Sequence, residues 1–469
     1  ADALEAFGEA FFFGYLGDGA WKNLRDAIDL HLQVGDKSDR DLARICARAL
    51  ETPVRWPGTM DSVPAEAEVH NYLQIGFDHA GTADNEERAR LLTLKSFWPH
   101  AFGEALERSH ETLVPPAESL AAGKEAVAMA ERLRRGDLES GALDGVAANY
   151  LSQGLYRQAL EMTNRRLELA EAIDDPWEMG DIYGMGGWVN FHLGRYRDAF
   201  SSADTGFRKT FERIPRVALH CLSWRAVSRY RLGDWDGVLA DLDQGVTMLG
   251  GRSEAPPHFV SPMYAAAVLV HEIRGNHVDA DRILALLRNL DKSAEPRDRD
   301  TTPLGRWASF LAPVLARRGN LQEAERLLVE TSWRRGARAG LLMEAQCEIA
   351  VETTECQEVN GLVALARAEA LRCGLEALPC WVDRLEGSRA LRAGDTEGAI
   401  EAFRRASTGF ERLGARWDLA RSDLALAQAL KDSGRGEEAL AVLRPAVAFF
   451  AEMGARTEHE AALRMAGAS

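Results

Sequence analysis

The chain has 469 residues, of which 46% are hydrophobic, and it carries a formal net charge of −16. This length exceeds one ordinary hydrophobic core, so we expect several domains or a repeat array. The apolar content excludes general disorder. The phosphates of a nucleic acid are negatively charged and would be repelled by a chain with this net charge, so we expect no direct nucleic-acid binding. Six cysteines without short pairing suit reduced thiols in a cytoplasm. No apolar run reaches the roughly 18 residues that a membrane helix needs.

We expect residues 1–139 to form irregular helical hairpins that cap the repeats that follow them. Apolar spacing favours helices in six stretches: 2–16, 22–33, 38–50, 64–79, 85–107 and 116–134. Acidic residues precede the run Phe11–Phe13, which therefore does not resemble a signal peptide. No initiating Met is present, and we interpret the chain as part of a longer protein. The Phe run either packs internally or docks on an upstream domain or on a second copy of the chain.

A repeated phrase organises residues 140–469: a Gly, a bulky residue two positions later, and Ala or Val three positions after that. The Gly residues are separated by 40, 39, 42, 44, 75 and 40 positions. The step of 75 predicts two repeats, with one degraded copy near residues 359–364. The period is therefore about 40 residues, and the whole chain would form about 10 hairpins. The seven Gly positions are Gly154, Gly194, Gly233, Gly275, Gly319, Gly394 and Gly434.

The phrase has a simple physical interpretation. Each Gly ends a first helix, because a positive φ costs glycine little. The bulky residue, such as Tyr156, Tyr196 or Trp235, fills the angle between the two helices. Neither helix can bury its apolar face alone, so neighbouring hairpins must stack. The sequence therefore predicts an all-α fold, an α-solenoid wound as a right-handed superhelix.

This phrase resembles the tetratricopeptide repeat. Gly187 and Gly387 stand seven residues before a repeat Gly, where that family places a small residue between close helices. The longer period, with the segments 410–421, 434–439 and 449–455, resembles the helical arm of bacterial LuxR-type ATP-binding transcription regulators and of class III nucleotide cyclase-associated signalling proteins. This resemblance implies a cytoplasmic sensor and scaffold arm in signalling or transcription regulation. It also implies an upstream ATPase or output domain.

In tetratricopeptide proteins, positions on the first helices line the concave face and bind partners. The resemblance therefore implies a groove for a protein, a peptide or a small anionic ligand, since aromatic and Arg side chains suit recognition. The alternative for each residue is packing between hairpins or pairing on a solvated face. The candidate residues are Asp181, Trp188, Phe191, His192, His220, Tyr230, Arg231, Arg306, Arg317, Trp381, Arg384 and Arg392.

Motifs for chemistry are missing from the sequence. It contains no phosphate-binding loop, no H-E-x-x-H, no G-x-S-x-G and no C-x-x-C. The gaps between Cys347, Cys356, Cys373 and Cys380 do not match zinc spacing. His192 and His220 have no carboxylate at ligand spacing. We therefore expect no enzyme, no cofactor and no metal. Two alternatives stay open: a ligand-free assembly scaffold, and a helical-repeat enzyme such as a phosphatase.

Overall fold

The computed structural model describes residues 1–467 except 61, 103–111, 252–257, 294–306, 332–338 and 352–355. Every regular element in these described parts is a helix. This confirms the prediction of an all-α solenoid. None of the described helices is long and apolar enough to cross a membrane.

The N-terminal region forms helices close to the predicted ranges, except that the single helix expected over 85–107 is broken by a turn at Phe97. The chain between α3 and α4, rich in proline, forms a π-helical turn and a 3-10 turn. Residue 139, after which we divided the chain, lies within α8, and α5, α7 and α8 pack on one another. The division itself stays a prediction. The elements are α1 (Asp2–Phe13), α2 (Gly17–Val34), α3 (Asp39–Leu50), η1 (Glu51–Arg55), η2 (Pro57–Thr59), α4 (Glu66–Ala80), α5 (Glu86–Ser96) and α7 (Pro116–Leu133).

Hairpins of two helices then follow one another along the chain. We call the first group, α8 to α15, the first array. It consists of α8 (Gly136–Ser152), α9 (Tyr156–Leu169), η3 (Ala170–Ala172), α10 (Pro176–Leu193), α11 (Tyr196–Thr210), α12 (Pro215–Leu232), α13 (Trp235–Met248), η4 (His258–Val260), α14 (Ser261–Ile273) and α15 (His277–Ser293).

A connecting hairpin, α17 (Ala308–Arg317) and α18 (Leu321–Thr331), leads to the remaining helices, which we call the second array. The degraded repeat expected near residues 359–364 is the hairpin of α19 and α20. The second array consists of α19 (Ala339–Ala350), α20 (Cys356–Cys373), α21 (Leu378–Arg392), α22 (Thr396–Leu413), α23 (Arg416–Asp432), α24 (Gly436–Met453) and α25 (Arg456–Ala466).

Local sequence explains where these helices begin and end. α10 begins at Pro176, whose fixed φ and missing N–H suit the first turn, and the Asp175 carboxylate accepts a hydrogen bond from the Trp177 N–H. The same helix ends at Gly194, which has a φ of 89°. All seven repeat Gly residues have a positive φ, as the phrase predicts. Tyr156 and Tyr196 are buried between the helices of their hairpins.

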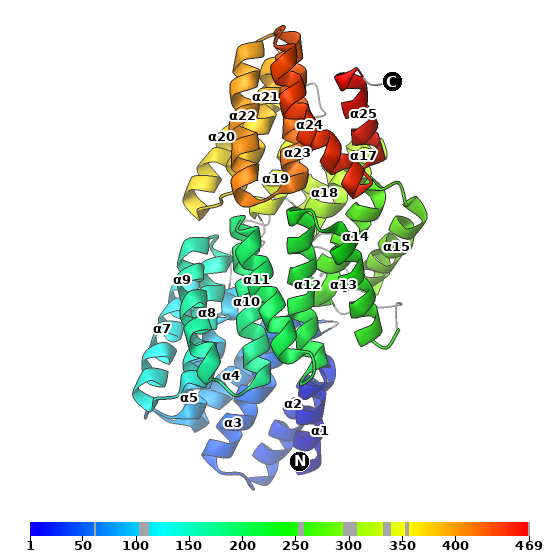
Figure 1. The fold of residues 1–469 in the computed structure, drawn as a ribbon. Helices are drawn as coiled ribbons and strands as arrows, with labels where there is room; N and C mark the ends of the chain where they lie inside the picture. The colour runs from blue at the N-terminus through cyan, green and yellow to red at the C-terminus, as the bar shows by residue number, and fades with distance from the viewer. Residues whose placement is uncertain are drawn as a thin grey trace.

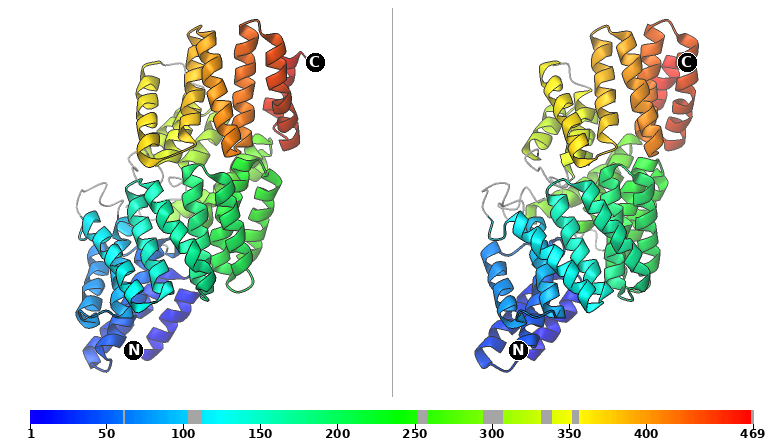
Figure 2. Two further views of the ribbon diagram at one scale, coloured as in Figure 1. Left: turned by 60° about the vertical axis from the view of Figure 1, so that its left-hand side comes forward. Right: turned by 90° about the vertical axis from the view of Figure 1, so that its left-hand side faces the viewer.

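The two arrays are stacked, so that helix ends of one meet helix ends of the other (Figures 1 and 2). The Glu376 N–H donates to the Leu193 carbonyl at 2.8 Å. Three Arg side chains donate to carbonyls across the contact: Arg197 to Arg412 at 3.0 Å, Arg274 to Met453 at 2.9 Å and Arg372 to Gln153 at 2.9 Å. These carbonyls lie at helix C-termini, where unpaired oxygens and the helix dipole favour a cation.

Candidate functional site

First helices of successive hairpins pack side by side through the molecule. α10 packs on α12, α12 on α14, α14 on α17 and α17 on α19. We call the side along which these helices pack the inner face. α12 also contacts α23 of the second array, so the inner face continues across the contact between the arrays.

The structure buries most of the predicted residues inside the chain. Eight of them are less than 9% exposed: Asp181, Trp188, Phe191, His192, Tyr230, Arg231, Trp381 and Arg384. His220 and Arg317 are half-buried, and Arg392 is exposed. Arg306 lies outside the described residues. We expected an open groove, whereas in this structure the chain itself covers these side chains. Their role in binding stays a prediction.

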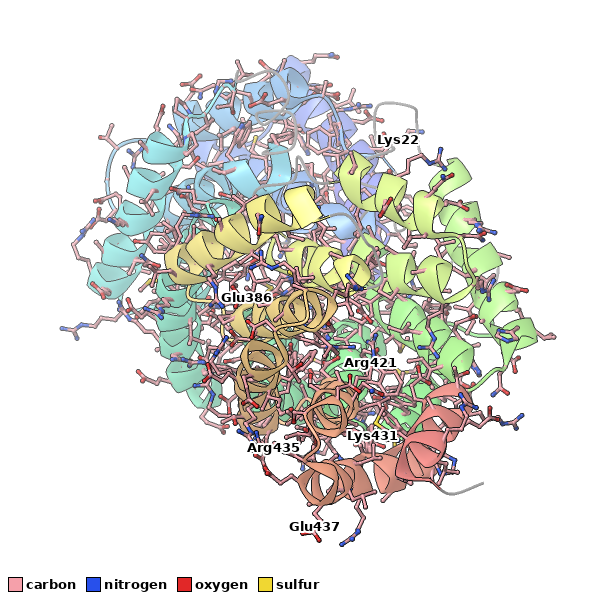
Figure 3. All side chains as sticks on the ribbon, turned by 90° about the horizontal axis from the view of Figure 1, so that it is seen from above. Lys22, Glu386, Arg421, Lys431, Arg435 and Glu437 are labelled. Carbon is pink, nitrogen blue, oxygen red and sulfur yellow. The ribbon has the colours of Figure 1, made fainter. Side chains whose placement is uncertain are left out.

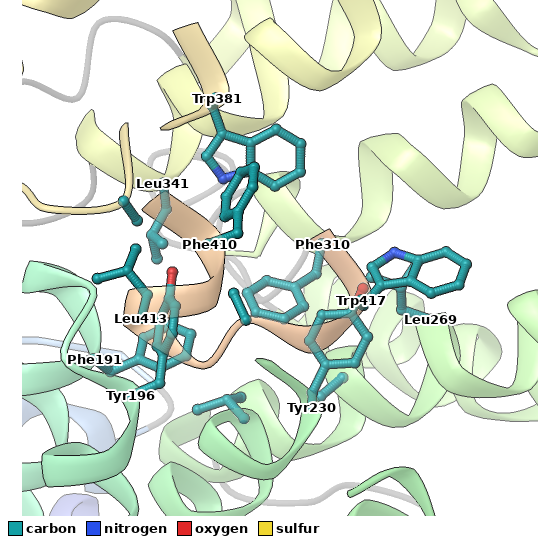
Figure 4. Packing of buried hydrophobic residues seen from close by; sticks show 14 of the residues in the cluster. Phe191, Tyr196, Tyr230, Leu269, Phe310, Leu341, Trp381, Phe410, Leu413 and Trp417 are labelled. Carbon is teal, nitrogen blue, oxygen red and sulfur yellow. The ribbon is translucent and has the colours of Figure 1, made fainter. Parts of the chain in front are cut away.

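Aromatic rings fill the inner face (Figure 4). Phe310 of α17 lies with its ring centroid 6.5 Å from that of Phe191 and 5.8 Å from that of Tyr230. Trp224 lies 6.0 Å from Trp307. One continuous hydrophobic core extends from Ala147 to Ala462 and includes both arrays. The same rings that resemble recognition residues thus pack against one another here.

A first buried charge cluster surrounds Asp181; it comprises Arg55, Asp144, Arg166, Glu178 and Asp181. Arg55, from the π-helical turn, places Nη2 3.1 Å from Asp144, 2.9 Å from Glu178 and 3.0 Å from Asp181. Arg166, on α9, lies 2.6 Å from Asp181 and 2.5 Å from Asp144. The N-terminal region is therefore joined to the first array by charge-assisted contacts that are shielded from water.

In this cluster, the protonation states of the three carboxyls bring their total charge close to that of the two guanidinium groups. Burial raises the pKa of Asp144 to about 7, although both Arg side chains oppose the shift. Burial also acts on Asp181, but Arg166 and Arg55 outweigh it and lower the pKa of that carboxyl to about 2. Near neutral pH, one partly protonated carboxyl and two carboxylates therefore face two cations, so little unpaired charge is buried.

A second cluster, which we call the inter-array cluster, joins the two arrays. Arg231 of α12 is its contribution from the first array. Its Nη2 lies 2.9 Å from a Glu344 oxygen on α19, and its Nη1 lies 3.2 Å from an Asp418 oxygen on α23. Arg421, which lies among the helices of the second array in Figure 3, pairs with Glu348. The cluster comprises Arg231, Glu344, Glu348, Arg384, Asp418 and Arg421.

Burial is the largest single influence on the pKa of each carboxyl in the inter-array cluster. It raises the pKa of Glu344 to about 7, with Arg231 acting in the opposite direction. It also raises the pKa of Asp418 above its ordinary value. The pKa of Glu348 is lowered, because Arg421 and Arg384 outweigh its burial. The contact between the arrays thus contains carboxyls that are costly to ionise.

The two histidines on the inner face have structural partners. His192 Nδ1 lies 2.9 Å from the Trp188 carbonyl oxygen. The Trp224 indole N–H donates to His220 Nε2 at 3.0 Å. Burial lowers the pKa of His220, so its ring is neutral near neutral pH. These bonds fit histidines that support packing between helices.

Two shallow hollows lie away from the inner face. One, of about 460 Å³, lies between α3, α4, α5 and α7 and is bordered by Arg40, His79 and Arg135. The other, of about 400 Å³, lies beside Arg135, Ile173 and Asp175. Neither includes a predicted binding residue.

Sequence reasoning did not identify Arg55, Asp144, Arg166 or Glu178. Arg55 lies between Pro53 and Pro57, outside the six predicted helical stretches, and its partners are 89 to 126 residues away. A charged residue at an otherwise apolar helical position was the only available signal.

The fold and the inner face define a class: this chain is an all-α solenoid of tetratricopeptide-like hairpins. No protein-family model matches its sequence, and no curated protein matches it. Among solved structures, the Rap protein complexed with competence and sporulation factor is 10% identical, with 88% of this chain and 98% of that chain covered and a TM-score of 0.41.

Two other solved structures match over most of this chain. Cut9–Hcn1, a hetero-tetramer of the APC/C, is 14% identical, with 98% of this chain and 96% of that chain covered and a TM-score of 0.44. Yeast Tom70 is 12% identical, with coverage of 98% and 95% and a TM-score of 0.30. These identities and scores are too low to carry an argument about function.

Proposed function

We propose that this chain is a non-enzymatic binding and scaffold arm of a cytoplasmic bacterial signalling or transcription-regulatory protein. Its ligand is a protein segment or peptide with acidic and aromatic side chains, and it binds along the inner face. The observation that carries the proposal is the inter-array cluster: Arg231, a predicted ligand-binding residue, is held by Glu344 and Asp418 of the same chain.

Glu344 and Asp418 occupy the place that an anionic ligand would take. An Arg fork recognises carboxylates by geometry, so a carboxylate on a partner competes with these internal ones. Binding then requires the arrays to separate. A ligand that binds only the open form shifts the population toward it, and its apparent affinity falls with the fraction that is closed.

This mechanism gives the arm an output as well as a ligand. The contact between the arrays combines the helix-end hydrogen bonds of Arg197, Arg274 and Arg372 with apolar packing, in which the ring centroid of Trp235 lies 5.1 Å from that of Trp417. Separation of the arrays would expose this contact but leave the packing within each array in place, so it should cost less than global unfolding. An attached domain would sense the ligand as a change in the distance between the two arrays.

The test is selection from a random peptide library against the whole chain. We expect selected peptides to be rich in Asp, Glu and aromatic residues. Arg231→Gln should abolish their binding in a protein with unchanged far-UV circular dichroism. Arg274→Ala, which removes the donor to the Met453 carbonyl and leaves the cluster intact, should bind about fivefold more tightly because it favours the open form.

Arg404→Ala is the matched control, since Arg404 pairs with Glu438 inside the second array. It should bind like the wild type. The proposal fails if the selected peptides bind Arg231→Gln as well as they bind the wild type. A selection that gives no binding peptide would favour the ligand-free scaffold.

A further inference from the structure

Three metal-ligating side chains converge where α1 packs on α2, near the N-terminus in Figure 1. Asp2 and Glu5 are three residues apart on α1 and therefore share one face of that helix. His31 lies in the last turn of α2. One ligand atom from each of the three side chains lies within 4.8 Å of the other two.

His31 is directed into this cluster and has no exposed surface. Its Nδ1 lies 2.7 Å from Asp36 Oδ1, while its Nε2 makes no hydrogen bond. That Nε2 lies 3.8 Å from Asp2 Oδ1 and 3.8 Å from Glu5 Oε2. A carboxylate accepts hydrogen bonds, so in the neutral ring Asp36 holds the proton on Nδ1. The Nε2 lone pair then points at two anionic oxygens, an arrangement that a bound cation would stabilise.

A cation already interacts with these oxygens. Lys37 Nζ lies 2.9 Å from Asp2 Oδ1 and 3.5 Å from Glu5 Oε2. The hydrogen bond and the charge of Lys37 hold the pKa of Asp2 below its usual range, so this carboxyl is ionised at neutral pH. Arg44 binds the other Glu5 oxygen at 2.6 Å and leaves Oε2 directed toward His31.

We propose that Asp2, Glu5 and His31 bind one Zn²⁺ ion, which displaces the Lys37 ammonium group. Imidazole nitrogen and carboxylate oxygen are ordinary zinc ligands at about 2.0–2.2 Å, and a water completes the tetrahedron. Tetrahedral ligands at that distance are roughly 3.4 Å apart, so the Asp2 and Glu5 oxygens, which lie 3.8 Å from His31 Nε2 and within 4.8 Å of each other, must draw in around the ion. The Asp2 side chain is 81% exposed and free to make this movement.

Asp36 serves as the partner that orients the ring, as carboxylates commonly do for zinc-binding histidines. The ion would join the first turn of α1 to the last turn of α2. The residues of this site are distant in sequence from those of the inner face, and the proposal does not depend on the proposed function.

The test is calorimetric titration of the whole chain with ZnCl₂, with Co²⁺ as a spectroscopic substitute. We expect one Zn²⁺ per chain and visible Co²⁺ bands of tetrahedral type. Glu5→Gln should abolish high-affinity binding, and Asp36→Asn should weaken it about tenfold or more. Lys37→Ala removes the competing ammonium and keeps every ligand, so it should bind about fivefold more tightly. His79→Asn, at a separate His–Asp pair, should bind like the wild type.

The Lys37→Ala variant keeps every ligand, so it tests the site even if another variant fails to fold, and no gain in Zn²⁺ affinity in folded Lys37→Ala would count against the proposal. Absence of Zn²⁺ heat and of Co²⁺ bands in folded wild type would overturn the proposal. So would Zn²⁺ binding that is unchanged in a folded Glu5→Gln variant.

Discussion

At the scale of single residues, the buried carboxyls govern how this molecule responds to pH. Glu344 faces Arg231, Asp418 and Glu348. Burial raises the pKa of Glu344 by more than the charge of Arg231 lowers it, so this pKa is about 7. A buried ion pair of this kind adds little net stability compared with a neutral group of the same shape. It does specify which helices meet, since an unpaired Arg231 would be costly.

Glu344→Gln tests this directly through the pH dependence of stability. The folded state keeps the Glu344 proton up to about pH 7, whereas the unfolded chain releases it near 4.5. Stability from this group is therefore present at pH 4.5 and is lost as pH rises through 7. We expect wild type and Glu344→Gln to have similar melting temperatures at pH 5. At pH 8 the variant should be more stable by about 1–3 kcal/mol.

The measurement is thermal unfolding of both proteins at the two pH values, followed by far-UV circular dichroism. The other titrating groups are shared by the two proteins and largely cancel in the difference. A wild type that is more stable than the variant at pH 8 by the same amount as at pH 5 would contradict the raised pKa.

At the scale of helices and turns, the repeat Gly residues do two different jobs. Gly394 has a φ of 81° with open space around its α-carbon, so only its backbone conformation requires glycine. Gly194 has a φ of 89°, and a β-carbon there would lie 2.9 Å from the backbone nitrogen of Ala377 in the second array. The first is a helix cap, and the second is both a cap and a docking point.

This difference yields a matched pair of variants. Gly394→Ala should lower the free energy of unfolding by about 1–2 kcal/mol, because alanine is strained in the left-handed conformation. Gly194→Ala should cost more, because the Ala377 backbone must also move, and should loosen the contact between arrays. Denaturant unfolding and limited proteolysis of the two variants provide the check. Equal losses and equal proteolysis would show that the turn at Gly194 does not bear on the second array.

The sequence predicted the hairpins well, because each is specified by a local signal. A Gly at the helix end and a bulky residue two positions later act within about 40 residues, and Tyr196 and Trp235 are buried as expected. The small residue predicted at Gly387 fits closely: a β-carbon there would lie 2.7 Å from the Phe403 ring. Period and packing of neighbouring hairpins follow from such local rules.

The sequence could not predict how the inner face closes. Arg231 and Asp418 are 187 positions apart, and no local spacing links them. A small change in the angle between hairpins, repeated along the chain, decides whether the arrays touch. The candidate residues were expected to line an open groove, whereas Phe191 and Tyr230 pack into a continuous core.

At the scale of the whole molecule, this protein is one solenoid whose later helices close on its earlier ones. Apolar packing runs through both arrays, and hydrogen bonds at helix ends and the inter-array cluster add polar contacts between them. The proposed function requires the arrays to separate at this contact, which is centred on Arg231. Reversal of that charge would leave Glu344 and Asp418 facing a third carboxylate, with strong repulsion in a buried setting.

Small-angle X-ray scattering of wild type and Arg231→Glu tests this separation, with the exposed Arg404→Glu as the control. We expect the wild type and the control to be compact. We expect Arg231→Glu to have a larger radius of gyration with unchanged helical circular dichroism. A wild type that is already extended, or an Arg231→Glu variant as compact as Arg404→Glu, would contradict the proposed separation.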